Sequence, residues 1–310
     1  MGKLAYIFPG QGSQSVGMGK DLFDNSEAAR EVFEAADEAL GFSLSALCFS
    51  GDEADLQLTA NTQPAILTAS MAAYYAARAE GLPEPDFVAG HSLGEYSALV
   101  AAGVLNLAAA VQVVRNRGTY MQEAVPIGVG AMAAILGLEM DAINRGCAEA
   151  AQGQVCSPAN INSPSQVVIA GDTKAIDRAC EIFKEYGAKR TIKLNVSAPF
   201  HCALMMPAQE RLTPELSGLE YGEFQFPIVH NVNASENADA SVVGEKLSQQ
   251  ISSTVLWLQS INELAAKGVD RFVEIGPGRV LTGLLRQINK SAASANIEDV
   301  STLRNTLATL

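Results

Sequence analysis

The stretch Phe87-Val88-Ala89-Gly90-His91-Ser92-Leu93-Gly94-Glu95-Tyr96 decides the fold. Its first three residues predict a short buried strand, and the residues from Glu95 onward predict a helix that ends at Gly103. Ser92 would then lie on the turn between them, where the flanking glycines permit a sharp bend and the helix N-terminus offers free amide groups. A Gly-x-Ser-x-Gly run in this position is typical of a nucleophilic serine in acyl transfer. An ordinary strand-to-helix turn is the alternative.

Length and composition indicate the class of protein. With 310 residues, of which 48% are hydrophobic and 6% aromatic, the chain can form a large core of alanine, valine and leucine. The longest stretch of low charge, 98–114, contains polar residues, so we expect buried helices there and no role at a membrane. A net charge of −13 argues against nucleic acid as a partner, because phosphate binding needs a cationic surface.

The cysteines and the N-terminus indicate the compartment. Five cysteines are widely spaced, without a Cys-x-x-Cys pair, and only three histidines accompany them. This pattern predicts reduced thiols and no metal site. The first residues pass quickly into a Pro9-Gly10 loop and leave no room for the apolar core of a signal peptide. We therefore expect a cytoplasmic protein.

The order of predicted elements indicates two kinds of sheet. Up to about residue 125, short apolar segments alternate with helices, which predicts an α/β architecture with a mostly parallel sheet. The segment 126–199 follows the order strand, helix, strand, strand, helix, strand of a ferredoxin-like unit. We expect a large α/β domain, residues 1–125 and 200–310, with a small ferredoxin-like subdomain, residues 126–199, inserted in it. The segment 291–296 is predicted to be a loose loop.

A glycine-rich loop, Phe8-Pro9-Gly10-Gln11-Gly12-Ser13-Gln14, ends the first predicted strand. It does not fit the dinucleotide-binding pattern, because no helix opens directly after it, and it is not a Walker loop, because Met18 stands where a lysine is needed. Beside Ser92, the loop could supply the Gln11 amide as a hydrogen-bond donor to an oxyanion. A turn without any ligand explains the loop equally well.

A nucleophilic serine needs a base, and the chain offers His91, His201 and His230. His91 adjoins Ser92, so its side chain should point away from the serine. His230 lies in a strand-like run, where a buried structural histidine is the ordinary case. His201 lies where the subdomain returns to the large domain, which makes it the better candidate.

Arg117 projects from the apolar side of a helix predicted at 107–122. A guanidinium group stays protonated, so a buried one needs an anion as its partner. A structural aspartate or glutamate is the more frequent partner, and an acidic substrate is the functional alternative.

Taken together, five motifs resemble the malonyl-CoA:acyl carrier protein transacylases over essentially the whole chain, namely 8–14, 90–95, Arg117, His201 and 274–278. The expected insertion also matches that family's ferredoxin-like subdomain within a hydrolase-like core. By the same resemblance, Gln250 would orient His201 through its main-chain carbonyl rather than through its side chain.

The resemblance also implies roles for the remaining site residues. Ser92 would be the nucleophile and His201 its base, and the backbone amides of Gln11 and Leu93 would hold the oxyanion. Arg117 would bind the malonyl carboxylate. The implied reaction is a ping-pong transfer of malonyl from malonyl-CoA to the phosphopantetheine thiol of acyl carrier protein, in fatty-acid synthesis. The expected protein is a monomer without a cofactor, since the CoA thioester is a substrate.

Three alternatives remain open. An acyltransferase of a polyketide pathway would share every motif. A serine esterase or thioesterase would need an acid between Ser92 and His201, where Asp141, Asp172 and Asp177 lie, but these are at expected helix starts, where N-capping is the simpler role. A non-catalytic acyl-binding protein would fit if Ser92 and His201 were out of reach of each other.

Two further expectations concern partners. Carrier proteins are acidic, so an acidic enzyme needs a local basic patch to bind one; two groups of residues are candidates, Lys184, Lys189, Arg190 and Lys193, or Arg279, Arg286 and Lys290. Phe200, directly before His201, resembles the malonyl-selective form of this loop, so methylmalonyl should fit poorly.

Overall fold

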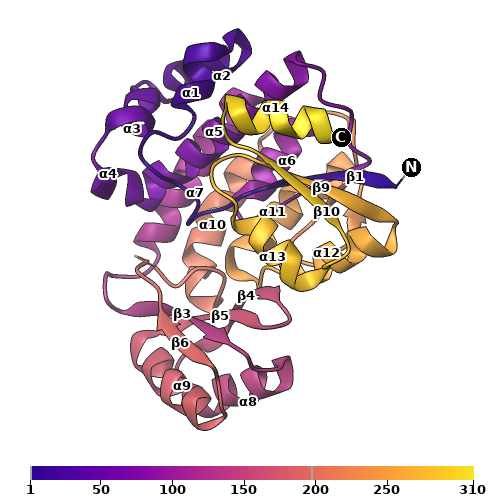
Figure 1. Cartoon of the computed structure of the whole chain (residues 1–310). Helices are drawn as coiled ribbons and strands as arrows, with labels where there is room; N and C mark the ends of the chain where they lie inside the picture. The colour runs from indigo at the N-terminus through magenta and orange to yellow at the C-terminus, as the bar shows by residue number, and fades with distance from the viewer. Residues whose placement is uncertain (1, 197) are drawn as a thin grey trace.

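Two sheets organise the chain, whose computed structural model describes residues 2–196 and 198–310 (Figure 1). Met1 and Ser197, which the expected domain boundaries include, lie outside the described residues. The larger sheet has the strand order β10-β9-β1-β2-β7-β8, and all neighbours are parallel except the pair β7 and β8. Its strands are β1 (Lys3–Phe8), β2 (Phe87–Gly90), β7 (Ile228–Val229), β8 (Glu236–Asn237), β9 (Val269–Ile275) and β10 (Ala293–Ile297).

Helices pack on both faces of this sheet, because side chains alternate along the buried strands. On β1, Leu4, Tyr6 and Phe8 enter one apolar cluster, whereas Ala5 and Ile7 enter the other. The α/β fold expected from the sequence is confirmed. The helices of this part are α1 (Lys20–Asn25), α2 (Glu27–Leu40), α3 (Leu44–Ser50), α4 (Glu53–Gln57), α5 (Thr59–Ala79), α6 (Gly94–Ala101), α7 (Leu107–Glu123), α10 (Met206–Ser217), α11 (Val243–Ser252), α12 (Trp257–Ala266), α13 (Val280–Ile288) and α14 (Val300–Thr309), with 3-10 turns η1 (Ala203–Met205) and η2 (Ala240–Val242).

The smaller sheet contains the strands between α7 and α10. It comprises β3 (Gly130–Leu136), β4 (Cys156–Ser163), β5 (Gln166–Asp172) and β6 (Arg190–Lys193), with α8 (Met140–Ala151) and α9 (Thr173–Glu185) between strands. Its order is β4-β5-β3-β6 with every pair antiparallel, the arrangement of a ferredoxin-like unit. Helices α8 and α9 cover the face that points away from the larger sheet (Figure 1).

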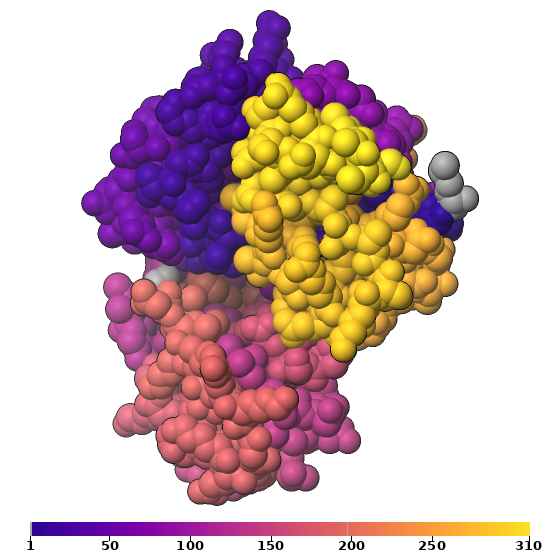
Figure 2. Space-filling view, in the orientation of Figure 1, coloured from indigo at the N-terminus to yellow at the C-terminus, as the bar shows by residue number. Residues whose placement is uncertain are grey.

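The other face of the small sheet packs toward the rest of the chain, which contains the larger sheet and its helices. Met132 and Ala134 on β3 and Val168 on β5 belong to the same apolar cluster as the core of the large part, whereas Ile135 and Ile169 pack under α8 and α9. In Figure 2 the subdomain (magenta to salmon) extends below the rest, and the N-terminal and C-terminal segments lie against each other above it. There the Val300 amide donates to Asp21 Oδ2 at 2.9 Å. The inserted sheet thus lines one side of a cleft between the subdomain and the rest of the chain.

Helix α7 shows how local sequence positions a functional side chain. Asn106 caps its N-terminus by accepting from the amides of Ala108 and Ala109. From that start, Arg117 falls on the same buried side as Val113 and Val114. The inward direction expected for Arg117 is confirmed.

Two local expectations are wrong. The segment 291–296 is largely strand β10, which pairs in parallel with β9 along the sheet edge; its small and polar residues hide the alternation that marks a strand. The N-capping roles are also wrong. Neither α8 nor α9 has a side-chain cap; Asp172 accepts from the Val155 amide instead, and Asp177 forms an ion pair with Lys193.

None of the helices in the described ranges combines the length and the apolar character that a bilayer crossing requires.

Candidate active site

Ser92 lies on a strained turn between β2 and α6. Its φ is +53°, in the left-handed region that favours glycine. Both flanking glycines are required, because a Cβ on Gly90 would overlap main-chain atoms of Gly94, and one on Gly94 would overlap the Phe8 carbonyl. The chain therefore bends sharply enough to lift the Ser92 hydroxyl away from the backbone.

His201 lies against this hydroxyl, with Nε2 at 2.7 Å from Ser92 Oγ. Its Nδ1 is 2.9 Å from the main-chain carbonyl oxygen of Gln250, so Nδ1 carries the proton and Nε2 is free to accept one. Burial, together with the positive charge of Arg117, lowers the His201 pKa from 6.5 to about 3. At neutral pH the imidazole is uncharged and can act as a base.

Arg117 is the third group at this point, and its side chain is only 1% exposed. Its guanidinium donates to Gln63 Oε1 at 2.7 Å, to Gln250 Oε1 at 2.9 Å and to Ser92 Oγ at 3.1 Å. Among residues 2–196 and 198–310, none of the carboxylates forms an ion pair with it. Burial lowers the Arg117 pKa from its ordinary value. The structural ion pair considered from the sequence is therefore wrong, and a buried cation stands beside the hydroxyl with only neutral partners.

Two backbone amides near Ser92 are available to an oxyanion. Gln11 and Leu93 border a cavity that Ser92 also lines, and the main-chain N–H group of neither residue donates a hydrogen bond to any part of the chain that the structure describes. By contrast, the Ser92 amide is already used, since it donates to Asn231 Oδ1 at 2.6 Å. The two residues expected from the sequence thus have free donors, Leu93 at the N-terminus of α6 and Gln11 in the loop after β1.

Ser92, His201 and Arg117 border a cavity of about 430 Å³ that lies between the subdomain with the smaller sheet and the part of the chain with the larger sheet. They line it together with many apolar residues, which come in part from the small sheet and from α13. The apolar wall residues are Leu93, Met121, Met132, Ala134, Val168, Leu194, Val196, Phe200, Val280, Leu281 and Leu284. A small acyl group with one charged end fits this distribution.

The other two histidines have structural partners. His91 Nε2 is 2.8 Å from Asn162 Oδ1, and its ring meets Trp257 edge to face. His230 is fully buried, and its Nδ1 is 2.6 Å from Glu95 Oε1. Both therefore agree with the packing roles expected for them.

Sequence reasoning missed several residues that hold the site. Gln63 holds Arg117 from α5, and Asn231 holds the Ser92 amide from the end of β7. Polar residues within apolar runs were the available signal, because buried amides need partners. Glu274, in a motif without an assigned role, accepts from the amides of Leu281 and Thr282 and so caps α13.

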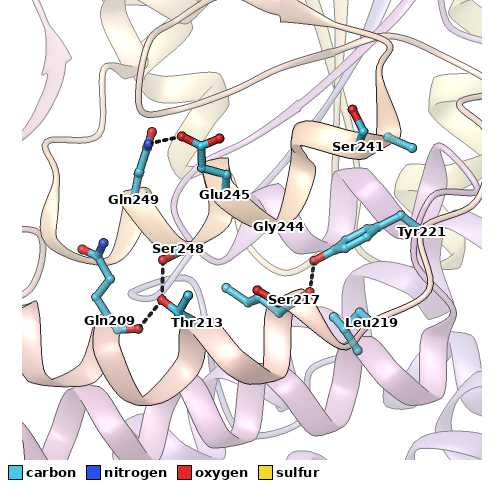
Figure 3. Close-up of a pocket in the computed structure, with 12 residues that line it drawn as sticks. Gln209, Thr213, Ser217, Leu219, Tyr221, Ser241, Gly244, Glu245, Ser248 and Gln249 are labelled. Carbon is cyan, nitrogen blue, oxygen red and sulfur yellow. Dashed lines mark hydrogen bonds between the residues drawn. The ribbon is translucent and has the colours of Figure 1, made fainter.

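A second, larger cavity of about 730 Å³ opens between α10 and α11 (Figure 3). Two pairs of its polar side chains are bonded to each other: Thr213 Oγ1 is 2.6 Å from Ser248 Oγ, and Gln249 donates to Glu245. The Tyr221 hydroxyl donates to a main-chain carbonyl. None of the described residues that line it is a histidine. In the described ranges, no group of three or more His, Cys, Asp or Glu side chains could hold a metal ion.

Comparisons with known proteins agree with this geometry. Residues 5–305 match the family model described as acyl transferase domain. The chain is 46% identical to the malonyl CoA-acyl carrier protein transacylase of Bacillus subtilis, over 100% of this chain and 98% of that protein. The protein of the same name from Escherichia coli is 46% identical over 98% of both chains.

Solved structures are similarly close over the whole length. The crystal structure of an acyl carrier protein S-malonyltransferase from Vibrio cholerae superposes with a TM-score of 0.96 at 47% identity, covering 98% of this chain and 99% of that one. A type II PKS acyl-carrier protein in complex with its malonyl-transacylase gives 0.97 at 45% identity, covering 99% and 100%.

Proposed function

Because this chain belongs to the acyl transferase family, we propose that it transfers the malonyl group from malonyl-CoA to the phosphopantetheine thiol of an acyl carrier protein, for fatty-acid synthesis. The observation that carries the choice of acyl group is the buried Arg117 guanidinium, which lacks a carboxylate partner and lies 3.1 Å from Ser92 Oγ. A malonyl carboxylate would supply the missing anion, whereas an acetyl group would leave the cation unpaired.

In the first half-reaction, His201 Nε2 takes the proton of Ser92 Oγ as this oxygen attacks the thioester carbonyl. The negative charge that develops on the carbonyl oxygen is held by the amides of Gln11 and Leu93, each contributing about 3 kcal/mol to the transition state. The C–S bond then breaks, and His201 returns the proton to the departing CoA sulfur. Malonyl-Ser92 remains, with its carboxylate on Arg117.

The second half-reaction reverses these steps with a different thiol. The carrier protein's thiol gives its proton to His201 and attacks the ester carbonyl, and Ser92 leaves and regains a proton. A thiol leaves more easily than an amine, because its pKa is about 8.5. This difference explains why a main-chain carbonyl behind His201 suffices in place of a buried acid. We propose no cofactor, since these groups supply every proton transfer and charge contact.

The geometry disfavours two of the three alternatives, the esterase and the non-catalytic binding protein. An esterase would be expected to place a carboxylate on His201 Nδ1, but the Gln250 carbonyl oxygen occupies that position at 2.9 Å. A non-catalytic binding protein would have no reason to hold Ser92 Oγ and His201 Nε2 at 2.7 Å.

We place the carrier protein beside Lys189 and Arg190. Of the candidate basic residues, Lys184, Lys193 and Arg279 form ion pairs within the chain. Lys189 and Arg190 are exposed, form no ion pair among the described residues, and line a hollow of about 410 Å³. Gln166 borders both this hollow and the catalytic cavity, so a thiol-bearing arm could reach Ser92 from there.

The distribution of charge favours this surface. The segment 126–199 has seven basic and seven acidic residues, so the chain's net charge of −13 resides entirely in the large part. An acidic partner would be repelled least at the neutral subdomain. We further propose a cytoplasmic monomer; the five free cysteines suit a reducing compartment.

Mass spectrometry after brief incubation with malonyl-CoA tests the proposed function. The intact protein should gain one malonyl group on the peptide that contains Ser92, and addition of thiol-bearing carrier protein should remove it. The Ser92→Ala variant should gain none. Release of free malonate without carrier protein would indicate an esterase, and absence of an adduct on the intact protein would indicate a binding protein.

A further inference from the structure

Glu95 lies directly behind the catalytic groups, although the mechanism above does not use it. The side chain is completely buried in the first turn of α6. Its Oε1 is 2.6 Å from His230 Nδ1, and its Oε2 accepts from the Asn231 amide at 3.0 Å and from Gln250 Nε2 at 2.8 Å. One buried carboxylate thus has three hydrogen-bond partners.

The hydrogen-bond network assigns the charge of this cluster. Asn237 Oδ1 accepts from the Asp239 amide at 2.8 Å, so Asn237 Nδ2 is the group that faces His230 Nε2 at 3.1 Å. His230 Nε2 must then be an acceptor, which leaves the proton on Nδ1 and the imidazole neutral. All three partners of Glu95 are donors, so the carboxylate is ionised and His230 does not cancel its charge.

The Gln250 side-chain amide connects the Glu95 carboxylate with Arg117. Its Nε2 donates to Glu95 Oε2 and to the Ser92 carbonyl at 2.9 Å. Because both the Glu95 carboxylate and the Ser92 carbonyl are acceptors, the NH2 group of Gln250 must face them. Gln250 Oε1 therefore faces Arg117 and accepts from its Nη2 at 2.9 Å. If the amide were reversed, its NH2 group would face the guanidinium and its oxygen would face the carboxylate.

We propose that Glu95 is a positioning residue for acyl-group selectivity, which acts on Arg117 through the Gln250 amide. The anion balances the buried guanidinium across one neutral group and holds the amide with its oxygen toward Arg117. Because the anion is one amide away, Arg117 keeps a face free for the substrate's carboxylate, which a direct ion pair would occupy. This inference rests on the proposed malonyl transfer.

The Glu95→Gln variant tests the role, because it removes the charge and keeps the size. The new side-chain amide can present its NH2 group to Gln250, so the orientation of the Gln250 amide is no longer fixed. Arg117 then loses Gln250 Oε1 as a constant hydrogen-bond acceptor. The ratio of kcat/KM for malonyl-CoA to that for acetyl-CoA should fall about tenfold, with acetyl transfer reduced much less. Equal losses for both acyl groups, or an unchanged ratio, would overturn the proposal.

Glu274→Gln is the matched control, because Glu274 is also completely buried and accepts two backbone amides. It should destabilise the protein without changing the acyl ratio. If the unaltered enzyme itself shows no preference for malonyl over acetyl, the proposed function fails; if it shows one that Glu95→Gln retains, only the role of Glu95 fails.

A double variant keeps the test decisive if Glu95→Gln does not fold. Glu95→Gln with Gln250→Glu preserves the total charge and moves the anion directly onto Arg117. Since His201 is held by the main-chain carbonyl of residue 250, its position does not depend on that side chain. The malonyl to acetyl ratio should again fall at least tenfold, and a ratio within twofold of the unaltered enzyme would contradict the proposal.

Discussion

Two cavities of this protein, the one at Ser92 and the one between α10 and α11, show that the larger cavity need not be the reactive one. The cavity between α10 and α11 is the larger, about 730 Å³ against about 430 Å³, yet it contains side chains that bond to each other, namely Thr213 with Ser248 and Gln249 with Glu245 (Figure 3). Among the described residues, the smaller cavity contains a buried cation that no carboxylate contacts directly, a neutral imidazole and two unused backbone amides. Groups left unpaired by the fold, rather than volume, mark where a ligand is bound and changed.

The difference has an energetic origin. Burying a cation without an anion, and leaving amides without acceptors, costs free energy of folding. A fold retains such groups when the substrate supplies the missing partners. Side chains that already satisfy one another, as around Thr213 and Ser248, contribute to stability and have little left to offer a ligand.

Among the changes that test this comparison, removal of the Arg117 guanidinium should reduce malonyl transfer the most. In Arg117→Ala, malonyl transfer should fall roughly a hundredfold or more, since truncating a buried charge partner costs about 3 kcal/mol. Acetyl transfer should fall far less. Steady-state kcat/KM for both CoA esters gives the comparison, with Arg115→Ala on the same helix as a control. Equal losses for both esters would show that Arg117 does not bind the substrate carboxylate.

Removal of one hydrogen-bond partner of Arg117 should reduce the preference for malonyl by an intermediate amount. Gln63→Leu removes the acceptor at 2.7 Å from Arg117, and one hydrogen bond to a charged group is worth about 1.5 kcal/mol, so the malonyl preference should fall about tenfold. Gln112→Leu, an exposed glutamine on α7, should leave the preference unchanged. The same two-substrate assay measures both. An unaltered preference in Gln63→Leu would mean that Gln250 alone positions the guanidinium.

The pH dependence should be weak across the physiological range. Because burial and Arg117 lower the His201 pKa to about 3, the rate of Ser92 acylation should stay flat from about pH 8 to about pH 5. The unfolded chain takes up this proton near pH 6.5, so the stability that His201 contributes is complete above that pH and is lost as pH falls toward 3. Rapid-quench measurement of malonyl-enzyme formation tests this, and a halving near pH 6.5 would contradict it.

Changes in the larger cavity should have the smallest effect on catalysis. Thr213→Val breaks the Thr213–Ser248 hydrogen bond and should cost about 1 kcal/mol of unfolding free energy, with kcat/KM for malonyl-CoA changed less than about twofold. Glu245→Gln should behave in the same way. Denaturant unfolding and the malonyl assay give both values. A tenfold loss of activity in a variant that stays folded would show that the two cavities are coupled.

Much of the fold was predictable because its signals are local. The strand, turn and helix around Ser92 and the buried face of α7 follow from side-chain periodicity and glycine spacing. Periodicity failed at β10, where small and polar residues hide the alternation. The expected N-cap failed at Asp172, whose carboxylate accepts from the Val155 amide, just before β4, instead of capping α9.

The sequence by itself determined that a serine would stand on a sharp bend, that an arginine would point into the core, and that a ferredoxin-like unit would interrupt an α/β domain. Only the tertiary structure decided which groups meet. Ser92 and His201 are 109 positions apart, Gln63 and Arg117 are 54 apart, and Glu95 and Gln250 are 155 apart. Local patterns fix which face of an element is buried. The partner that a buried polar group finds depends on how the elements pack, and at Arg117 the packing supplied no carboxylate.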